Sequence, residues 1–251
     1  MNLIISAFNL ILYQPLFNAL ILLYLYLPGR DFGIAVIVLT LLIRLILYPS
    51  MAQSLRAQKI LSELQPKIQE LQKKYKNDLA KQSQATLELY RKEKINPLSS
   101  IFPLLVQFPI LIALYRLFWK GFGNKEMIYL YGFIPDPGQI DPFFLNFLNL
   151  SQPSIILAVL AGIFQFFQTK MIMSATRQKP VEAKRGGPNF SEMLQKQMLY
   201  FFPVFTVFIL WKLPAVIGLY WLVTTVFSIF QQYLIFNKPR PSTSAIPIKS
   251  E

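Results

Sequence analysis

The chain has 251 residues, of which 54% are hydrophobic, and its mean hydropathy is +0.42. A soluble domain of this length is usually less apolar, so the composition indicates a membrane protein. The sequence contains neither Cys nor His. It therefore excludes disulfides, thiolate nucleophiles, Cys/His zinc sites and histidine acid–base catalysis. In a membrane protein, the net charge of +13 favours basic cytoplasmic loops and anionic lipids as their partners.

The N-terminal stretch 3–27 is apolar apart from a few uncharged polar side chains. It lacks a basic n-region and an A-x-A cleavage site, which argues against a cleaved signal peptide. Gln14-Pro15 interrupts it, and only a four-residue link separates it from the next apolar segment. We predict an amphipathic helix from Pro15 to Leu27 that lies in the outer interface. A further membrane span is the alternative.

Five later segments are apolar enough to cross a bilayer as helices. None shows the alternation of a barrel strand. Their apolar runs are Phe32–Tyr48, Leu98–Trp119, Pro153–Met173, Met198–Trp211 and Leu213–Phe236. The predicted organisation is an N-terminal region 1–31, spans at 32–50, 98–119, 153–173, 198–211 and 213–236, a cytoplasmic helical hairpin at 51–97, an extracytoplasmic loop at 120–152, a cytoplasmic loop at 174–197 and a basic cytoplasmic tail at 237–251.

Lys and Arg are distributed unevenly between alternate loops. Eighteen of them lie between Pro49 and Pro97, between Met173 and Met198, or after Phe236, and four lie in the other loops. An excess of Lys and Arg in short loops marks the cytoplasmic side. The N-terminus is therefore predicted outside and the C-terminus inside, with five spans between them.

The first cytoplasmic segment carries a helical pattern of its own. Asn77-Asp78 predicts a turn, so we expect two antiparallel helices from about Ser54 to Lys94 outside the bilayer. They would be a docking element for substrate, ribosome or targeting factor, or else a solvated loop without a partner. The first helix has a coiled-coil seam of Leu61, Leu64, Ile68, Leu71 and Tyr75. The second offers Leu79, Leu87 and Tyr90 to pack back on it.

Arg44 is the one charge in the run LTLLIRLILYPS, and a charge is costly inside a bilayer. It precedes Pro49 by five residues, about 7 Å along a helix, so snorkelling to the headgroups is one interpretation. The other is a charge that faces a water-filled cavity inside the bundle. The absence of acidic residues from all five spans favours the cavity. So do the uncharged polar side chains of the spans, which include Thr40, Gln107, Gln165, Gln168, Thr169, Thr224, Thr225, Ser228, Gln231 and Gln232.

Several ordered runs carry a family resemblance. They are YQPLFNALILLYLYLPGRDFGIAVIVLTLLIRLILYPS, LQPKIQELQKKY, KINPLSSIFPLLVQFPILIALY and FFPVFTVFILWKLPAVIGLYWLVTTVFSIFQQYLI. From about Tyr13 to Phe236 the sequence resembles the membrane-protein insertases of the YidC/Oxa/Alb superfamily. The resemblance implies an all-α membrane protein of the bacterial cytoplasmic (inner) membrane. It would have a five-helix transmembrane core, an outer interfacial amphipathic helix and a cytoplasmic helical hairpin, which is the layout that hydropathy and charge predict independently.

The resemblance also implies roles for single residues. Arg44 matches an arginine in a hydrophilic groove that is open to cytoplasm and lipid and closed to the outside. Thr40 and Trp221 match positions along the path of the client helix. With these, the predicted substrate groove comprises Arg44, Thr40, Gln107, Gln165, Gln168, Tyr220, Trp221, Thr224 and Ser228. The sequence departs from the family at Pro214–Val216, which lacks a frequent glycine, and at Arg116, for which snorkelling is our only interpretation.

The function that this resemblance implies is insertion of client proteins into the membrane. Nascent membrane proteins are the expected clients, with the Sec translocon, the ribosome, the signal recognition particle pathway and anionic lipids as further candidate partners. No cofactor or nucleotide is expected, because the chain contains no G-x-x-x-x-G-K-[ST] motif. An ion channel or solute transporter is a rival class, although we find no inverted repeat. A passive assembly chaperone is the other. The spans lack the carboxylate, His or Cys that acid–base or nucleophilic catalysis needs.

Overall fold

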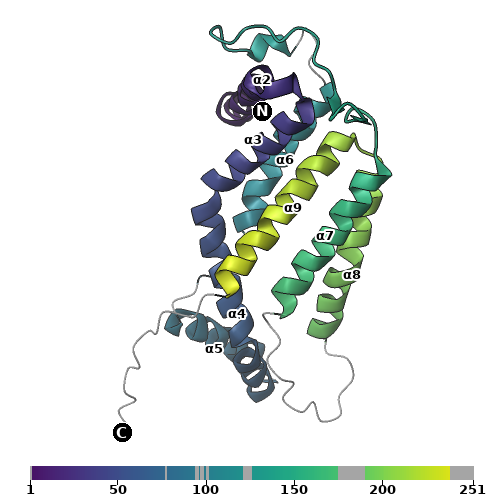
Figure 1. The fold of residues 1–251 in the computed structure, drawn as a ribbon. Coiled ribbons are helices and arrows are strands. Elements are labelled where there is room, and N and C mark those ends of the chain that lie inside the picture. The colour runs from purple at the N-terminus through teal and green to yellow at the C-terminus, as the bar shows by residue number, and fades with distance from the viewer. Residues whose placement is uncertain are drawn as a thin grey trace.

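The computed structural model describes residues 2–76, 78–93, 96, 99, 102–120, 126–174 and 190–237, and most of them are helical. Figure 1 shows α3, α6, α7, α8 and α9 side by side as a bundle, with α2 at one end and α4 and α5 at the other. The elements are α1 Asn2–Phe8, η1 Asn9–Tyr13, α2 Gln14–Tyr26, η2 Pro28–Arg30, α3 Phe32–Ile46, α4 Tyr48–Lys74, α5 Leu79–Lys92, α6 Phe102–Lys120, η4 Met127–Tyr129, β1 Phe143–Phe144, β2 Leu148–Asn149, α7 Ile155–Ser174, α8 Phe190–Leu210 and α9 Ala215–Phe236.

Three helices of the described chain are long and apolar enough to cross a membrane: Leu3–Tyr26, Ile155–Met173 and Ala215–Phe236. The bent pair of α3 and α4 is a fourth candidate. The apolar parts of α6 and α8 are shorter, at Leu105–Phe118 and Leu199–Leu210. The all-helical fold class is confirmed, whereas the five-helix membrane core and the domain boundaries stay predictions.

The N-terminal helix is longer than the sequence predicts. It runs from Asn2 to Tyr26 without the expected break at Gln14-Pro15. A π-helical turn precedes Pro15, and in it the amide of Gln14 donates to the carbonyl of Asn9. Such a widened turn lets a helix pass a residue that cannot donate a hydrogen bond. Figure 1 shows this helix crossing the end of the bundle. Its place in the outer interface stays a prediction.

The hairpin of α4 and α5 differs from its predicted packing. Leu64 and Ile68 of the seam are buried, and Lys67 of α4 forms an ion pair of 3.3 Å with Glu93 after α5. Leu79 and Leu87, however, are exposed, so the prediction that they pack back on α4 is wrong. The helical register of α5 turns these two leucines away from α4. The prediction named apolar residues without a regular helical spacing, and such a set does not define which face of the helix is buried.

A sharp bend separates α3 from α4. The two helices meet at Leu47 with an angle of 64°, and Pro49 lies in the first turn of α4, where proline is tolerated. The bend carries the start of α4 beneath the bundle. There Leu55 packs against Ile235 at the end of α9, and the Lys59 ammonium donates to the Phe236 carbonyl at 2.9 Å. Part of the predicted hairpin therefore belongs to the bundle core.

Close packing joins α7 to α8 and α9. A Cβ on Gly162 of α7 would lie 2.3 Å from a methyl carbon of Val207 on α8. Ala158 and Ala161 on α7 are buried. Small residues let membrane helices approach closely and gain van der Waals contact. Helix α8 begins at Phe190, before the predicted span at 198–211, because its first turns contain polar residues that form helix well but lower hydropathy.

Arg116 of α6 does not snorkel. Its guanidinium donates to the side chains of Asn9 at 2.6 Å and Tyr129 at 3.1 Å, and it lies 4.3 Å from the centre of the Tyr13 ring. These partners belong to the N-terminal helix and to the loop after α6. The charge is thus held between segments of the protein, and the snorkelling interpretation is wrong.

Candidate functional site: a polar groove around Arg44

Arg44 lies in the last turn of α3, and only 8% of it is exposed. One terminal nitrogen donates to the side-chain oxygen of Gln107 on α6 at 3.0 Å. The Gln107 amide nitrogen in turn donates to the hydroxyl of Tyr220 on α9 at 2.7 Å. The residues that the structure describes form ion pairs elsewhere, and none of these pairs includes Arg44. A relay of neutral groups therefore holds the cation across three helices.

A cavity of about 370 Å³ opens beside this relay. Its walls come from the ends of α3, α6, α7 and α9 that lie toward α4, and from the first turns of α4 itself. Its polar side chains are all uncharged except for Arg44. The lining residues are Arg44, Met51, Leu55, Gln58, Pro103, Gln107, Gln165, Gln168, Ile172, Trp221, Thr224, Thr225, Ser228, Gln231 and Gln232.

Hydrogen bonds between lining residues orient part of this wall. The indole N–H of Trp221 donates to the side-chain oxygen of Gln165 at 3.0 Å, which ties α9 to α7. Ser228 donates to the Thr224 carbonyl at 2.8 Å. The Thr224 hydroxyl and the Gln232 amide oxygen are buried without a hydrogen-bond partner among the residues that the structure describes. Buried polar atoms are usually paired, and a polar cavity with such atoms is suited to water or to a polar peptide segment.

The structure brings seven of the nine predicted groove residues to the cavity and places the other two behind it. The seven are Arg44, Gln107, Gln165, Gln168, Trp221, Thr224 and Ser228. Thr40 is buried one turn before Arg44, and its hydroxyl donates to the Val36 carbonyl at 2.7 Å. Tyr220 is also buried and contacts the cavity only through Gln107. Contact of any of these residues with a client stays a prediction.

The first turns of α4 contribute groove residues that we did not predict. Met51, Leu55 and Gln58 line the cavity, although the sequence analysis assigns them to the cytoplasmic helical hairpin at 51–97. The signal was present in Pro49, which predicts a helix start directly after the span. A hydropathy window cannot show that the new helix turns back under the bundle.

An apolar cleft of about 490 Å³ adjoins the polar groove. It lies between α6, α8 and the first half of α9, and Trp221 lines both spaces. All of its lining side chains except Thr206 are apolar or aromatic: Phe108, Leu111, Ile112, Tyr115, Thr206, Ile209, Leu210, Leu213, Ile217 and Trp221. Polar and apolar surfaces thus meet at one indole ring.

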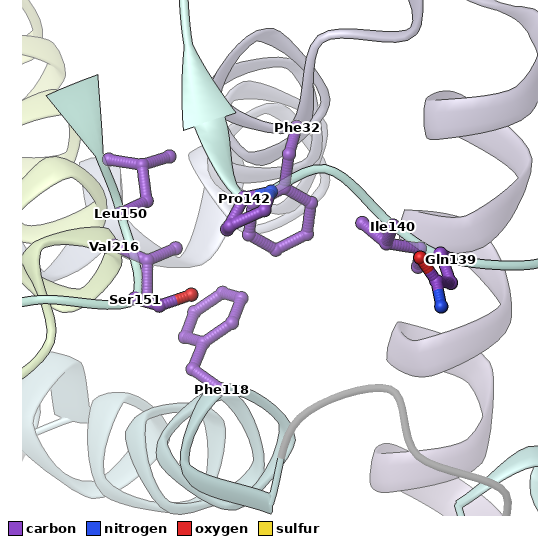
Figure 2. A pocket seen from close by; sticks show the side chains of 8 residues that line it. All are labelled: Phe32, Phe118, Gln139, Ile140, Pro142, Leu150, Ser151 and Val216. Carbon is purple, nitrogen blue, oxygen red and sulfur yellow. The ribbon is translucent and has the colours of Figure 1, made fainter. Parts of the chain in front are cut away.

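A further cavity, of about 340 Å³, lies at the opposite end of the bundle and is lined without any charged side chain (Figure 2). Phe32 at the start of α3 and Phe118 near the end of α6 point into it, beneath the chain that carries Ile140 and Pro142. Gln139 and Ser151 make part of its wall polar, but it contains no cation like Arg44. The charged groove therefore belongs to the end of the bundle next to α4.

The sequence of the chain is similar to those of several named proteins. Residues 23–242 match the family described as "60Kd inner membrane protein". The chain is 33% identical over 208 residues to a protein of Fusobacterium nucleatum named "Membrane protein insertase YidC", and the match covers 83% of this chain and 87% of that protein. A protein of the same name from Oceanobacillus iheyensis is 34% identical over 84% of this chain and 76% of its own length. In Magnetococcus marinus a longer protein of that name is 34% identical over 83% of this chain but only 33% of its own length.

Proposed function

This chain belongs to the 60Kd inner membrane protein family, and on that premise we propose that it inserts client proteins into the bilayer through the groove around Arg44. The family consists of multi-pass inner-membrane insertases of the YidC type, which are not enzymes. Their clients are membrane proteins. The finer statements, namely the route, the residues and the orientation, are our proposal.

The proposed orientation follows from charge. The end of the bundle next to α4 and α5 carries the large Lys and Arg excess, so it faces the cytoplasm. The N-terminal helix then lies on the outer side. Its first turns expose Leu3, Ile4, Leu10 and Ile11, while Phe17 and Leu20 are buried against the bundle. The helix therefore has one apolar face available to lipid and another packed on the bundle, and its position in the outer interface is part of the proposal.

The polar groove shortens the distance over which a client's polar terminus must cross hydrocarbon. A bilayer core is about 30 Å thick, and a hydrated cavity open to the cytoplasm removes part of this barrier. Arg44 attracts carboxylates of the client segment more strongly than in bulk water, because the surrounding dielectric constant is lower. A membrane potential that is positive outside adds about 2.3 kcal/mol per negative charge per 100 mV.

The apolar cleft gives the client's hydrophobic helix an exit. A segment beside Trp221 can contact the polar groove with its polar end and the cleft between α6 and α8 with its apolar residues. Burial of apolar surface in lipid then drives release into the bilayer. No nucleotide enters this sequence of steps.

The observation that carries the proposal is a buried cation held by neutral partners beside a polar cavity. Its test compares two single-span clients that differ only in the charge of the translocated tail. Replacement of Arg44 by Ala is expected to reduce insertion of the acidic client and to spare the neutral one, while Lys at this position retains much of the activity. Equal losses for both clients would leave Arg44 with a structural or hydrating role only.

Hydration of the groove is a second, independent test. The chain has no Cys, so Thr224→Cys would be the only thiol of the protein. Inverted vesicles expose the cytoplasmic side, and in them a membrane-impermeant maleimide is expected to label this thiol. Absence of labelling in a correctly inserted protein would contradict a groove open to the cytoplasm.

Reconstituted vesicles also distinguish the proposed insertase from two rival functions. A channel or transporter would conduct ions or solutes across reconstituted vesicles without a client, whereas the insertase is expected to conduct none. A passive chaperone would improve folding of clients that are already inserted and leave translocation of their tails unchanged. Tail translocation in liposomes without other proteins would also test whether the Sec translocon, the ribosome or the signal recognition particle pathway is needed.

A further inference from the structure

A second polar system lies at the end of the bundle opposite to Arg44. Asn18 of α2 is 1% exposed, and both its amide nitrogen and its oxygen are hydrogen-bonded. Its amide nitrogen donates to the carbonyl of Tyr129 at 2.8 Å, and its oxygen accepts from the amide of Tyr131 at 2.7 Å. The side chain thus pairs with the backbone of the loop segment 126–131 as a neighbouring strand would. A leucine of similar size would fill this space without holding that segment in one register.

Arg116 and Glu126 reinforce the same junction from the other side. The Tyr13 hydroxyl donates to the carboxylate of Glu126, while the Arg116 guanidinium covers the Tyr13 ring. Arg116 also donates to Asn9 and to the hydroxyl of Tyr129. The cluster therefore joins three segments: the N-terminal helix, the end of α6 and segment 126–131.

The polar ties continue along the loop over the end of the bundle. The Tyr24 hydroxyl accepts from the amide of Asp141, and the Asp31 carboxylate accepts from the amide of Leu145 at 2.6 Å. Between these points the loop covers the uncharged cavity lined by Phe32 and Phe118 (Figure 2). The loop and the N-terminal helix together form a cover over this end.

We propose that Asn18 and Arg116 are positioning residues of an outer seal, which holds segment 126–131 and the N-terminal helix over the bundle so that the groove around Arg44 opens to one side only. This inference rests on the proposed function. It assigns a role to Arg116, the charge that the groove does not use. Burial of polar groups is costly unless they are paired. In this cluster the Arg116 Nε has no hydrogen-bond partner among the described residues, but the paired groups meet in one geometry, which makes the closed position specific.

The test measures from which side the groove can be reached. Thr224→Cys supplies the single thiol, and an impermeant maleimide is applied to right-side-out and to inverted vesicles. The seal is weakened by Asn18→Leu or by Arg116→Met. Lys212→Met is the matched control, because it removes one basic charge at the same end from an exposed side chain. Arg116→Lys, which keeps the charge, tests for partial rescue.

With the intact seal and with the control, labelling is expected from the cytoplasmic side alone. In the weakened variants, labelling from the outer side is expected to rise about tenfold, which is a shift of about 1.4 kcal/mol in a local opening equilibrium. Cytoplasmic labelling should stay as in the parent, which shows that the bundle is still folded. Loss of cytoplasmic labelling would indicate that a variant is misfolded. The other of the two substitutions then decides whether the seal exists.

Two results would overturn separate claims. Cytoplasmic labelling in the parent together with an unchanged outer side in both folded variants would refute the seal and leave the groove intact. No labelling of the parent from either side would refute the open groove on which the inference rests. An equal rise in outer labelling in Lys212→Met and in Arg116→Met would show that surface charge, and not the polar cluster, controls access to the groove.

Discussion

Replacement of Gln107 by Glu should neutralise the positive charge of the groove while Arg44 itself stays in place. The Gln107 oxygen already accepts from Arg44 at 3.0 Å, and Glu has nearly the same shape as Gln. The new carboxylate would keep this contact and accept from the Tyr220 hydroxyl in place of the present donation. The geometry of the relay is thus preserved while the net charge of the site falls from +1 to about zero.

The size of the effect follows from the distance and the surroundings. Two unit charges at 4 Å interact by about 1 kcal/mol in water and about 4 kcal/mol at an effective dielectric constant of 20. The cavity holds about 370 Å³ and is lined largely by amides and hydroxyls, so the lower part of this interval applies. A loss of about 1 to 2 kcal/mol of attraction is about a 5- to 30-fold reduction in insertion of an acidic client.

The assay is co-reconstitution of the variant with paired single-span clients whose translocated tails differ only in charge, with protection of the tail from protease as the readout. Gln107→Leu is the matched control, since it removes the relay contacts but leaves the positive charge of Arg44 without a neutralising carboxylate. The acidic client is expected to suffer clearly more from Glu than from Leu. Equal defects in both variants would refute an electrostatic role, and full activity of the Glu variant would show that clients do not sense Arg44.

Three further substitutions test packing and hydrogen bonding in other parts of the bundle and in the groove wall. Gly162→Ala places a carbon 2.3 Å from Val207 and should lower the stability of the fold by about 1–3 kcal/mol. The readout is a lower thermal aggregation temperature in detergent. The control, Gly132→Ala, places its Cβ in open space and should leave this temperature unchanged. Asp31→Ala removes the acceptor of the Ile34 and Leu145 amides and should cost about 0.5–2 kcal/mol in the same assay. Trp221→Phe loses the bond to Gln165 and should slow insertion about 2- to 10-fold for acidic and neutral clients alike; a charge-dependent loss would contradict this.

Sequence reasoning could predict the groove because its signal is compositional. A lone cation, spans without acidic residues and repeated Gln, Thr and Ser stand out against an apolar background. Burial of these groups costs free energy unless they face one another or water, so a shared polar space is the physical expectation. The structure brings Arg44, Gln107 and Gln165 to one cavity, although their contacts with a client are still to be measured.

Other features depend on geometry that composition does not contain. The π-helical turn before Pro15 preserves a helix that a proline rule would end. The 64° bend carries Leu55 under the bundle, and no window average records a direction. Arg116 resembled a snorkelling charge because its partners, Asn9 and Tyr129, lie far away in sequence. In each case a tertiary contact overrides the local expectation.

In the proposed mechanism, the neutral partner of Arg44 affects how readily a client segment can be released from the groove. A guanidinium has five N–H groups, and only one of them is occupied by Gln107 in this structure. An internal carboxylate would have to be separated from the arginine in every cycle, and breaking a buried ion pair costs about 3–5 kcal/mol. In the proposed mechanism, an amide oxygen leaves the positive charge uncompensated, and donors without a partner among the described residues can bind a client's carboxylate. The client would then replace weak contacts on entry and lose a moderate one on release, so the groove would attract an acidic segment without retaining it.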